Sequence, residues 1–102
     1  MTKEDIKSAN ALIAAFYGDK FNSGTPNEKT TKVLATMVRE TGNCNKSISK
    51  LLNSLSSTTG ASGALKIVRA AAKLAKSDKK SFEMCNAVVK SKYRSVLEIT
   101  MI

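Results

Sequence analysis

The segment from Ala64 to Lys76 constrains the fold more than any other part of the chain. Placed on a helix at about 100° per residue, its basic side chains fall on one narrow arc. That arc consists of Lys66, Arg69, Lys73 and Lys76. The rest of the circumference is apolar and rich in alanine, which is wider than a helix needs if it touches the core on one side only. The sequence therefore predicts a largely interior helix, packed closely by neighbours on several sides, with a single basic edge.

The length of the chain limits how many such cores it can build. With 102 residues it is long enough for one hydrophobic core and too short for two. Hydrophobic residues make up 42% and charged residues 25%, which is typical of a globular protein and not of a disordered one. We therefore expect a single helical domain over residues 1–102, without separate catalytic and binding modules.

Two helices are predicted from the signals at their N-termini. Thr2 and Asp5 have the spacing of a capping box, so a first helix begins there and ends at Gly18, because glycine accepts the backbone conformation that ends many helices. In the sequence TPNE, Thr25 is the predicted N-cap, followed by a proline at the first helical position and a carboxylate three residues after the cap. A second helix is therefore predicted from Pro26 to about residue 41.

Hydrophobic spacing predicts the remaining elements. They are a third helix from about Cys44 to Ser56, a connector from Ser56 to Gly63, and a fifth, longest helix from near Lys79 almost to the end of the sequence. The predicted caps are Thr59 or Ser62 for the central helix and Ser77 or Asp78 for the last. No segment alternates with period two. The predicted fold is all-α, an orthogonal or up-down bundle of about five helices with no sheet.

The net charge of +9 is unevenly distributed along the chain. Residues 1–43 carry six basic and five acidic side chains, whereas residues 44–102 carry eleven basic and three acidic ones. A one-sided positive field attracts polyanions such as nucleic acid, anionic lipid or an acidic protein. The alternative is that these lysines lie on solvated helix faces and only confer solubility.

The most specific nucleic-acid signal lies between residues 34 and 53, where two predicted helices meet across Gly42 and Asn43. A connection this short is compatible with a helix-turn-helix, although any two consecutive helices of a bundle can share it. In the first case Asn, Ser and Lys side chains of the second helix would bond to base edges or phosphates. The candidate nucleic-acid-binding residues are Asn45, Lys46, Ser49, Lys50 and Asn53 in this corner, and Lys66, Arg69, Lys73, Lys76, Lys79 and Lys80 on the basic ridge at 66–80.

Most catalytic chemistry is disfavoured by the composition. The chain has no histidine, which removes the commonest general base and the commonest metal ligand. Cys44 and Cys85 are far apart and lie on apolar stripes, so we expect both to pack in the core and not to bind metal or form a disulfide. The sequence predicts no enzyme activity, no cofactor and no metal site.

Two non-enzymatic functions fit these observations. The first is a small regulator that binds duplex DNA or associates with nucleic acid through the corner and the basic ridge. If these two surfaces lie in one plane, a polyanion is favoured; if they are scattered, plain solubility is favoured. The second is an interaction or adaptor module that docks on an acidic partner protein, with a homodimer through the apolar C-terminal helix as a variant. A polar N-terminus and the lack of a long apolar run predict a cytoplasmic protein that does not enter membranes.

Overall fold

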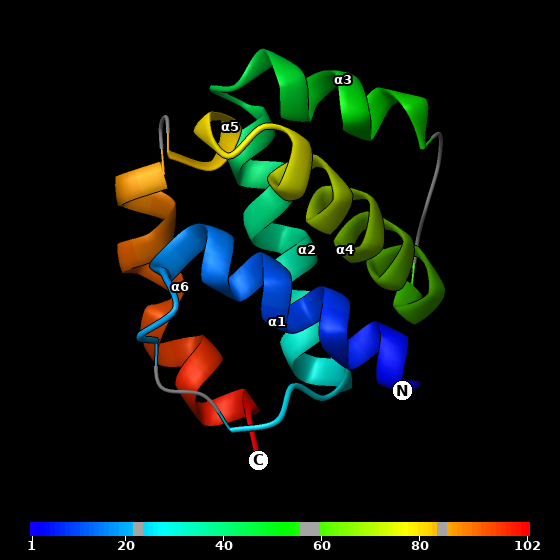
Figure 1. Cartoon of the computed structure of the whole chain (residues 1–102), viewed down its shortest axis with the longest axis vertical. Coiled ribbons are helices and arrows are strands. Elements are labelled where there is room, and N and C mark those ends of the chain that lie inside the picture. The colour runs from blue at the N-terminus through cyan, green and yellow to red at the C-terminus, as the bar shows by residue number, and fades with distance from the viewer. Residues whose placement is uncertain (22–23, 56–59, 84–85) are drawn as a thin grey trace.

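The structure, a computed structural model, describes residues 1–21, 24–55, 60–83 and 86–102. In these ranges it contains helices and no strand, so the predicted all-α fold is confirmed (Figure 1). The helices are α1 (Lys3–Tyr17), α2 (Glu28–Gly42), α3 (Lys46–Ser54), α4 (Gly60–Ser77), α5 (Lys80–Glu83) and α6 (Asn86–Thr100). They pack around one core in a body that measures 32 × 27 × 22 Å.

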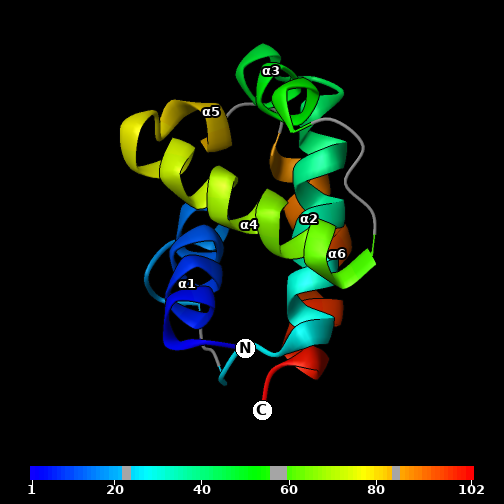
Figure 2. The same cartoon turned by 90° about the vertical axis from the view of Figure 1, so that its right-hand side faces the viewer.

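Helix α4 lies at the centre of this packing, as its alanine-rich sequence predicts. Its two main neighbours are α1 and α2, and Figure 2 shows it crossing α2 with α1 on its other side. Ile67, Val68 and Ala71 are fully or almost fully buried between them. Burying a side chain the size of valine or isoleucine contributes about 1.5–3 kcal/mol. The small alanines allow the neighbouring helices to approach on both sides while the basic edge stays in solvent.

The predicted beginning and end of α1 are confirmed. The Thr2 hydroxyl accepts a hydrogen bond from the Asp5 amide, and the Asp5 carboxylate accepts one from the Thr2 amide, which completes the capping box. Gly18 ends the helix at φ 87°, in the left-handed half of conformational space that glycine adopts readily. On the buried side of α1, Phe16 packs edge to face with Phe82 of α5 at a centroid distance of 5.3 Å.

The predicted start of α2 is wrong by two residues, because a tertiary contact holds the chain before it. Thr25 forms backbone hydrogen bonds with Ile102 in both directions, at 2.7 and 3.1 Å, and it does not cap the helix. Asn27 caps α2 instead: its side chain accepts from the Thr30 amide at 3.1 Å. The Asn27 side-chain amide also donates to the carbonyl of Thr100. The start of α2 is therefore fastened to the end of α6.

Helix α3 is shorter than predicted and begins later. Asn45 is its N-cap and accepts from the Ile48 amide at 3.1 Å, so the helix runs from Lys46 and ends at Ser54. Cys44 lies before the cap, and its side chain is exposed. The expectation that Cys44 packs in the core is therefore wrong. Cys85 lies outside the described residues.

The predicted long C-terminal helix is two helices. The short α5 brings Phe82 onto α1, whereas α6 runs beside α2 (Figure 1), and one straight helix could not make both contacts. At 18 residues, α4 is the longest helix of the described residues. Ser77 belongs to α4, and Ser62 lies inside it, so neither caps a following or central helix as predicted. The alternative cap Thr59 lies outside the described residues.

The apolar face predicted for the C-terminal helix is only partly covered. Val89 and Leu97 are buried, but Val88 is 76% exposed and Ile99 is 82% exposed. Tyr93 is half-buried, and its hydroxyl donates to Glu40 of α2 at 3.1 Å. The covered face of α6 is therefore a narrow strip that packs on α2.

Candidate nucleic-acid interface

The corner at residues 34–53 has helix α3 lying across the end of α2 (Figures 1 and 2). Ile48 is fully buried against the body, and Leu51 is half-buried at the same contact. Gly42 lies where the helices meet, and a Cβ there would lie 2.7 Å from Leu52 Cδ1, so the Leu52 side chain would have to shift to accept a larger residue. The two helices therefore form a steep, tightly packed corner whose outer surface belongs to α3.

One of the candidate residues in this corner does not point outward. Asn45 is buried, because its side chain is used to cap α3. The expectation that Asn45 projects outward is therefore wrong, because its side chain accepts a hydrogen bond from one of the amides left unpaired at the start of the helix. Lys46, Lys50 and Asn53 are exposed, and Ser49 is half-exposed. These four remain the outward candidates of α3.

The basic ridge, defined as Lys66, Arg69, Lys73, Lys76, Lys79 and Lys80, runs along the exposed edge of α4 and on to the start of α5. All six side chains belong to exposed residues. Within the described residues, none of the lysines of this ridge forms an ion pair, and the same holds for Lys46 and Lys50 of α3. Their charges are therefore available to an external anion.

Arg69 is the exception on the ridge, because it is tied to α1. Its Nε donates to Asp5 Oδ1 at 2.8 Å, and its Nη2 contacts the same oxygen. The Asp5 side chain is only 4% exposed, whereas that of Arg69 is 51% exposed. Hydrogen bonds from Arg69, followed by those at the start of α1, hold the pKa of the Asp5 carboxyl below its usual value. Arg69 is thus fixed in place with half of its side chain still open to solvent.

A groove runs between α1 and α4 beside this ridge. It consists of two adjoining hollows, one of about 270 Å³ and one of about 480 Å³, which share Ala11, Ala72 and Lys76. Its lining includes alanines of both helices, cations from three helices and the carboxylates Glu4 and Asp19. The cations are Lys7 from α1, Arg69, Lys73 and Lys76 from α4, Lys79, and Lys90 from α6.

Sequence reasoning missed Lys7 and Lys90. Both lie outside the corner and the basic ridge that the sequence singled out, and only the packing of α1 and α6 around α4 brings them to the groove. Lys7 lies one helical turn after Lys3 on the exposed face of α1. That spacing could have marked a basic edge on α1, but not its position opposite α4.

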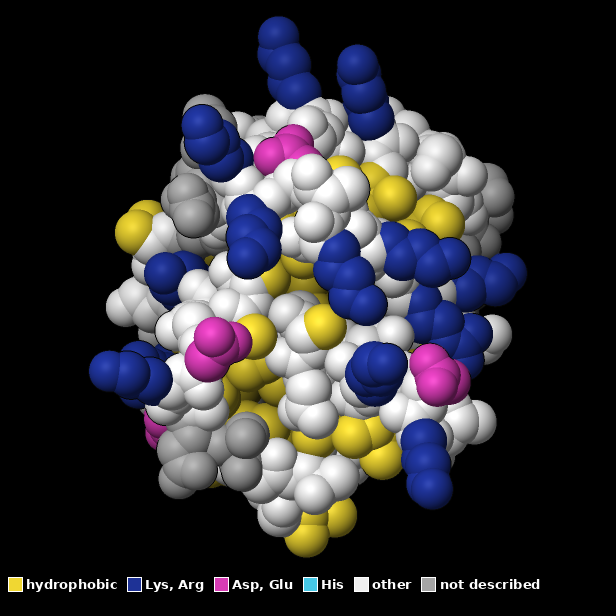
Figure 3. Space-filling view, viewed as in Figure 1, with side chains coloured by type: hydrophobic (Ala, Val, Ile, Leu, Met, Phe, Trp, Pro, Cys, Tyr) yellow, Lys and Arg dark blue, Asp and Glu magenta, His cyan; other side chains and the backbone are white. Residues whose placement is uncertain are grey.

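The basic side chains of α3 and α4 do not lie in one plane. Figure 3 shows Lys and Arg side chains spread over α4 and projecting from the upper edge over α3. Helix α3 packs on α4, so the two sets lie on neighbouring helices, but they face in different directions and uncharged side chains lie between them (Figure 3). We refer to the basic ridge with Lys7, Lys46 and Lys50 as the basic surface.

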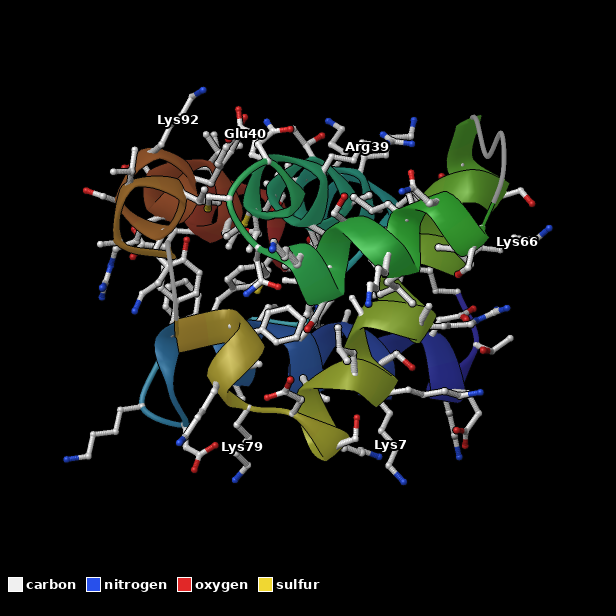
Figure 4. All side chains as sticks on the ribbon, turned by 90° about the horizontal axis from the view of Figure 1, so that it is seen from above. Lys7, Arg39, Glu40, Lys66, Lys79 and Lys92 are labelled. Atoms are coloured by element: carbon white, nitrogen blue, oxygen red, sulfur yellow. The ribbon has the colours of Figure 1, made fainter. Side chains whose placement is uncertain are left out.

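On the opposite side of the molecule, the Glu40 carboxylate is hydrogen-bonded to neighbouring side chains. Glu40 accepts hydrogen bonds from Lys92 Nζ at 3.0 Å and from the Tyr93 hydroxyl. The bond to Glu40 raises the pKa of Lys92. Figure 4 shows Glu40, Lys92 and Arg39 on the side of the molecule opposite Lys7 and Lys79. The charge of Lys92 is therefore partly neutralised, whereas the lysines of the basic surface form no ion pair with any described residue.

Comparisons of the chain with protein-family models, with curated proteins and with solved structures gave no match. Among the described helices, none combines the length and the apolar character needed to cross a membrane.

Proposed function

We propose that the protein binds duplex nucleic acid through the sugar–phosphate backbone, as a small nucleic-acid-associated regulator. The observation that supports this most directly is the unpaired charge of the lysines of the basic surface. In the described residues its lysines have no carboxylate partner, so a polyanion would gain attraction without displacing existing ion pairs.

The shape of this surface suits a duplex better than single strands. Successive cations on α4 are spaced by three or four residues, which places them about 4.5–6 Å apart along the helix axis, close enough for several to reach one backbone. Of the aromatic side chains, Phe16, Phe21 and Phe82 are buried, and the hydroxyls of Tyr17 and Tyr93 are bonded within the protein. No stacking platform for bases is formed by these residues.

Helix α3 is the part of the surface that could enter a major groove. It projects from the corner with α2, and Lys46, Ser49, Lys50 and Asn53 lie on its accessible side. Ser and Asn can bond to base edges, and Lys can bond to guanine or to phosphate. In this proposal α3 contacts base edges and gives any preference for sequence, whereas the basic ridge binds the sugar–phosphate backbone.

The experiment is a titration of a fluorescent DNA duplex with the full chain over a series of salt concentrations. We expect the logarithm of the binding constant to fall linearly with the logarithm of salt, with a slope steeper than about −3, since each neutralised phosphate adds about −0.9. No binding at micromolar protein in low salt would refute the proposal. Stronger binding to polyglutamate than to duplex would favour an acidic partner protein instead.

A further inference from the structure

The smaller hollow of the α1–α4 groove has the composition of a phosphate site. Its volume is about 270 Å³, and it is lined by Lys7 from α1 and by Arg69, Lys73 and Lys76 from α4. The Ser8 side chain adds a hydroxyl, and Glu4 is the single carboxylate of the lining. Cations thus outnumber anions around a space that is open to solvent on one side and closed by two packed helices on the other.

Arg69 differs from the lysines in this hollow because its orientation is fixed. The Asp5 carboxylate, itself almost fully buried, holds Nε and Nη2 from one side. The remaining N–H groups of the planar guanidinium are not engaged by any described residue. An arginine held in this way loses little conformational entropy when it binds an anion, because its rotamer is already set.

We propose that this hollow binds a phosphate group, with Arg69 as the oriented donor and Lys7, Lys73 and Lys76 as surrounding charges. Arginine binds phosphate through two parallel N–H···O bonds, whereas lysine acts as a point charge that follows the ligand. Asp5 is a positioning residue in this site: it fixes the guanidinium and does not touch the ligand. The phosphate would belong either to a nucleic-acid backbone, which rests on the proposed function, or to a free phosphorylated small molecule.

Pyrophosphate titrated into the isotopically labelled full chain at constant ionic strength tests the site. We expect saturable NMR shift changes centred on Ser8, Ala11, Arg69 and Ala72, including the Arg69 side-chain N–H. Arg69→Lys keeps the charge but removes the paired donors, so the affinity for pyrophosphate should fall about tenfold. Lys73→Gln, at an exposed position that does not contribute to the core, should weaken binding several-fold without affecting folding.

Lys32→Gln is the matched control. It removes one positive charge at an exposed position of α2, and Lys32 neither lines the hollow nor belongs to the basic surface. We expect less than a twofold change in the affinity for pyrophosphate. Shifts that never saturate, or equal losses for Lys32→Gln, Lys73→Gln and Arg69→Lys, would show a diffuse charge effect and overturn the phosphate site.

A parallel titration with the duplex separates this inference from the proposed function. Competition between pyrophosphate and duplex would show that the site takes a backbone phosphate. Saturable pyrophosphate binding with no duplex binding would retain the site for a free phosphorylated small molecule and refute the proposed function. Duplex binding without a saturable response to pyrophosphate would refute the phosphate site and retain the proposed function.

Discussion

Asp5 of α1 and Arg69 of α4 form a hydrogen-bonded ion pair in which Arg69 Nε lies 2.8 Å from Asp5 Oδ1. The same carboxylate accepts from the Thr2 amide through Oδ2, at 3.0 Å. The Asp5 side chain therefore takes part in the capping box of α1 and also links α1 to α4. The residues are 64 positions apart in the sequence, so their pairing depends on the correct packing of α1 on α4.

The Asp5 carboxylate should make stability depend on pH in acid. Its pKa is lower in the folded protein than its usual 3.8, so near and below that pH the unfolded chain binds more protons than the folded one. The contribution of Asp5 is therefore present above about pH 4 and is lost as the pH falls through the lower, folded pKa. Urea unfolding followed by circular dichroism between about pH 7 and pH 2 measures this loss.

Asp5→Asn is the control for that measurement. The amide keeps an acceptor for the helix cap but carries no charge, so the variant should be less stable at neutral pH and should lose less stability in acid than the wild type. If the two proteins lose the same stability between neutral pH and acid, the loss arises from carboxylates other than Asp5.

Ala71 should not tolerate a larger side chain. It is fully buried on α4, in the packing against α1 and α2. Ala71→Leu would force these helices apart or force side chains out of their preferred rotamers, at a cost of about 1–3 kcal/mol. Ala61→Leu, at an exposed position of the same helix, should change the free energy of unfolding by less than about 0.5 kcal/mol. Comparable losses in both variants would contradict an interior position for α4.

Asn27 should contribute both to the start of α2 and to its attachment to α6. Asn27→Ala removes the cap and the hydrogen bond to the Thr100 carbonyl, so it should cost about 1–2 kcal/mol or more in chemical unfolding. Asn27→Asp keeps the capping oxygen but lacks the donor to Thr100. Its free energy of unfolding should lie between those of the wild type and Asn27→Ala. The difference between the two variants measures the contribution of the cap.

Tyr17 should make the protein less stable at high pH. Burial raises its pKa to about 12, and its hydroxyl donates to the Lys90 carbonyl at 2.7 Å. Between about pH 10 and 12 the unfolded chain releases a proton that the folded protein keeps, so stability falls as the pH rises. Tyr17→Phe should be less stable at neutral pH and should lose less stability across this range. Ultraviolet absorbance of tyrosinate, recorded during the pH titration, reports the ionisation directly.

Local signals were sufficient to predict much of the fold. The capping box at Thr2 and Asp5, the end of α1 at Gly18 and the interior character of α4 all follow from spacing and residue type. The start of α2 was predicted wrongly because the backbone bonds between Thr25 and Ile102 join residues far apart in the sequence. No local pattern carries that information.

The candidate site was less predictable for the same reason. The ridge lysines of α4 follow from helical periodicity, but the α1–α4 groove arises only when Lys7, Lys76 and Lys90 of three helices are brought together. Asn45 was wrongly predicted to project outward because the start of α3 was predicted one or two residues too early, and at the true start Asn45 caps the helix. Binding of a polyanion to the basic surface stays a prediction, and two charge variants test it.

The most direct test of the account is the salt dependence of duplex binding in two variants of equal charge. One is Lys73→Gln with Lys76→Gln on the basic ridge. The other is Lys32→Gln with Lys92→Gln. Lys92 lies on the side of the molecule opposite Lys7 and Lys79 (Figure 4), and Lys32 is exposed on α2, seven residues before Arg39 and so on the same face of that helix. We predict that the first variant loses about two units of the log–log salt slope and binds at least tenfold more weakly in low salt, whereas the second stays near the wild type. Equal losses in both variants would contradict a binding surface centred on α4.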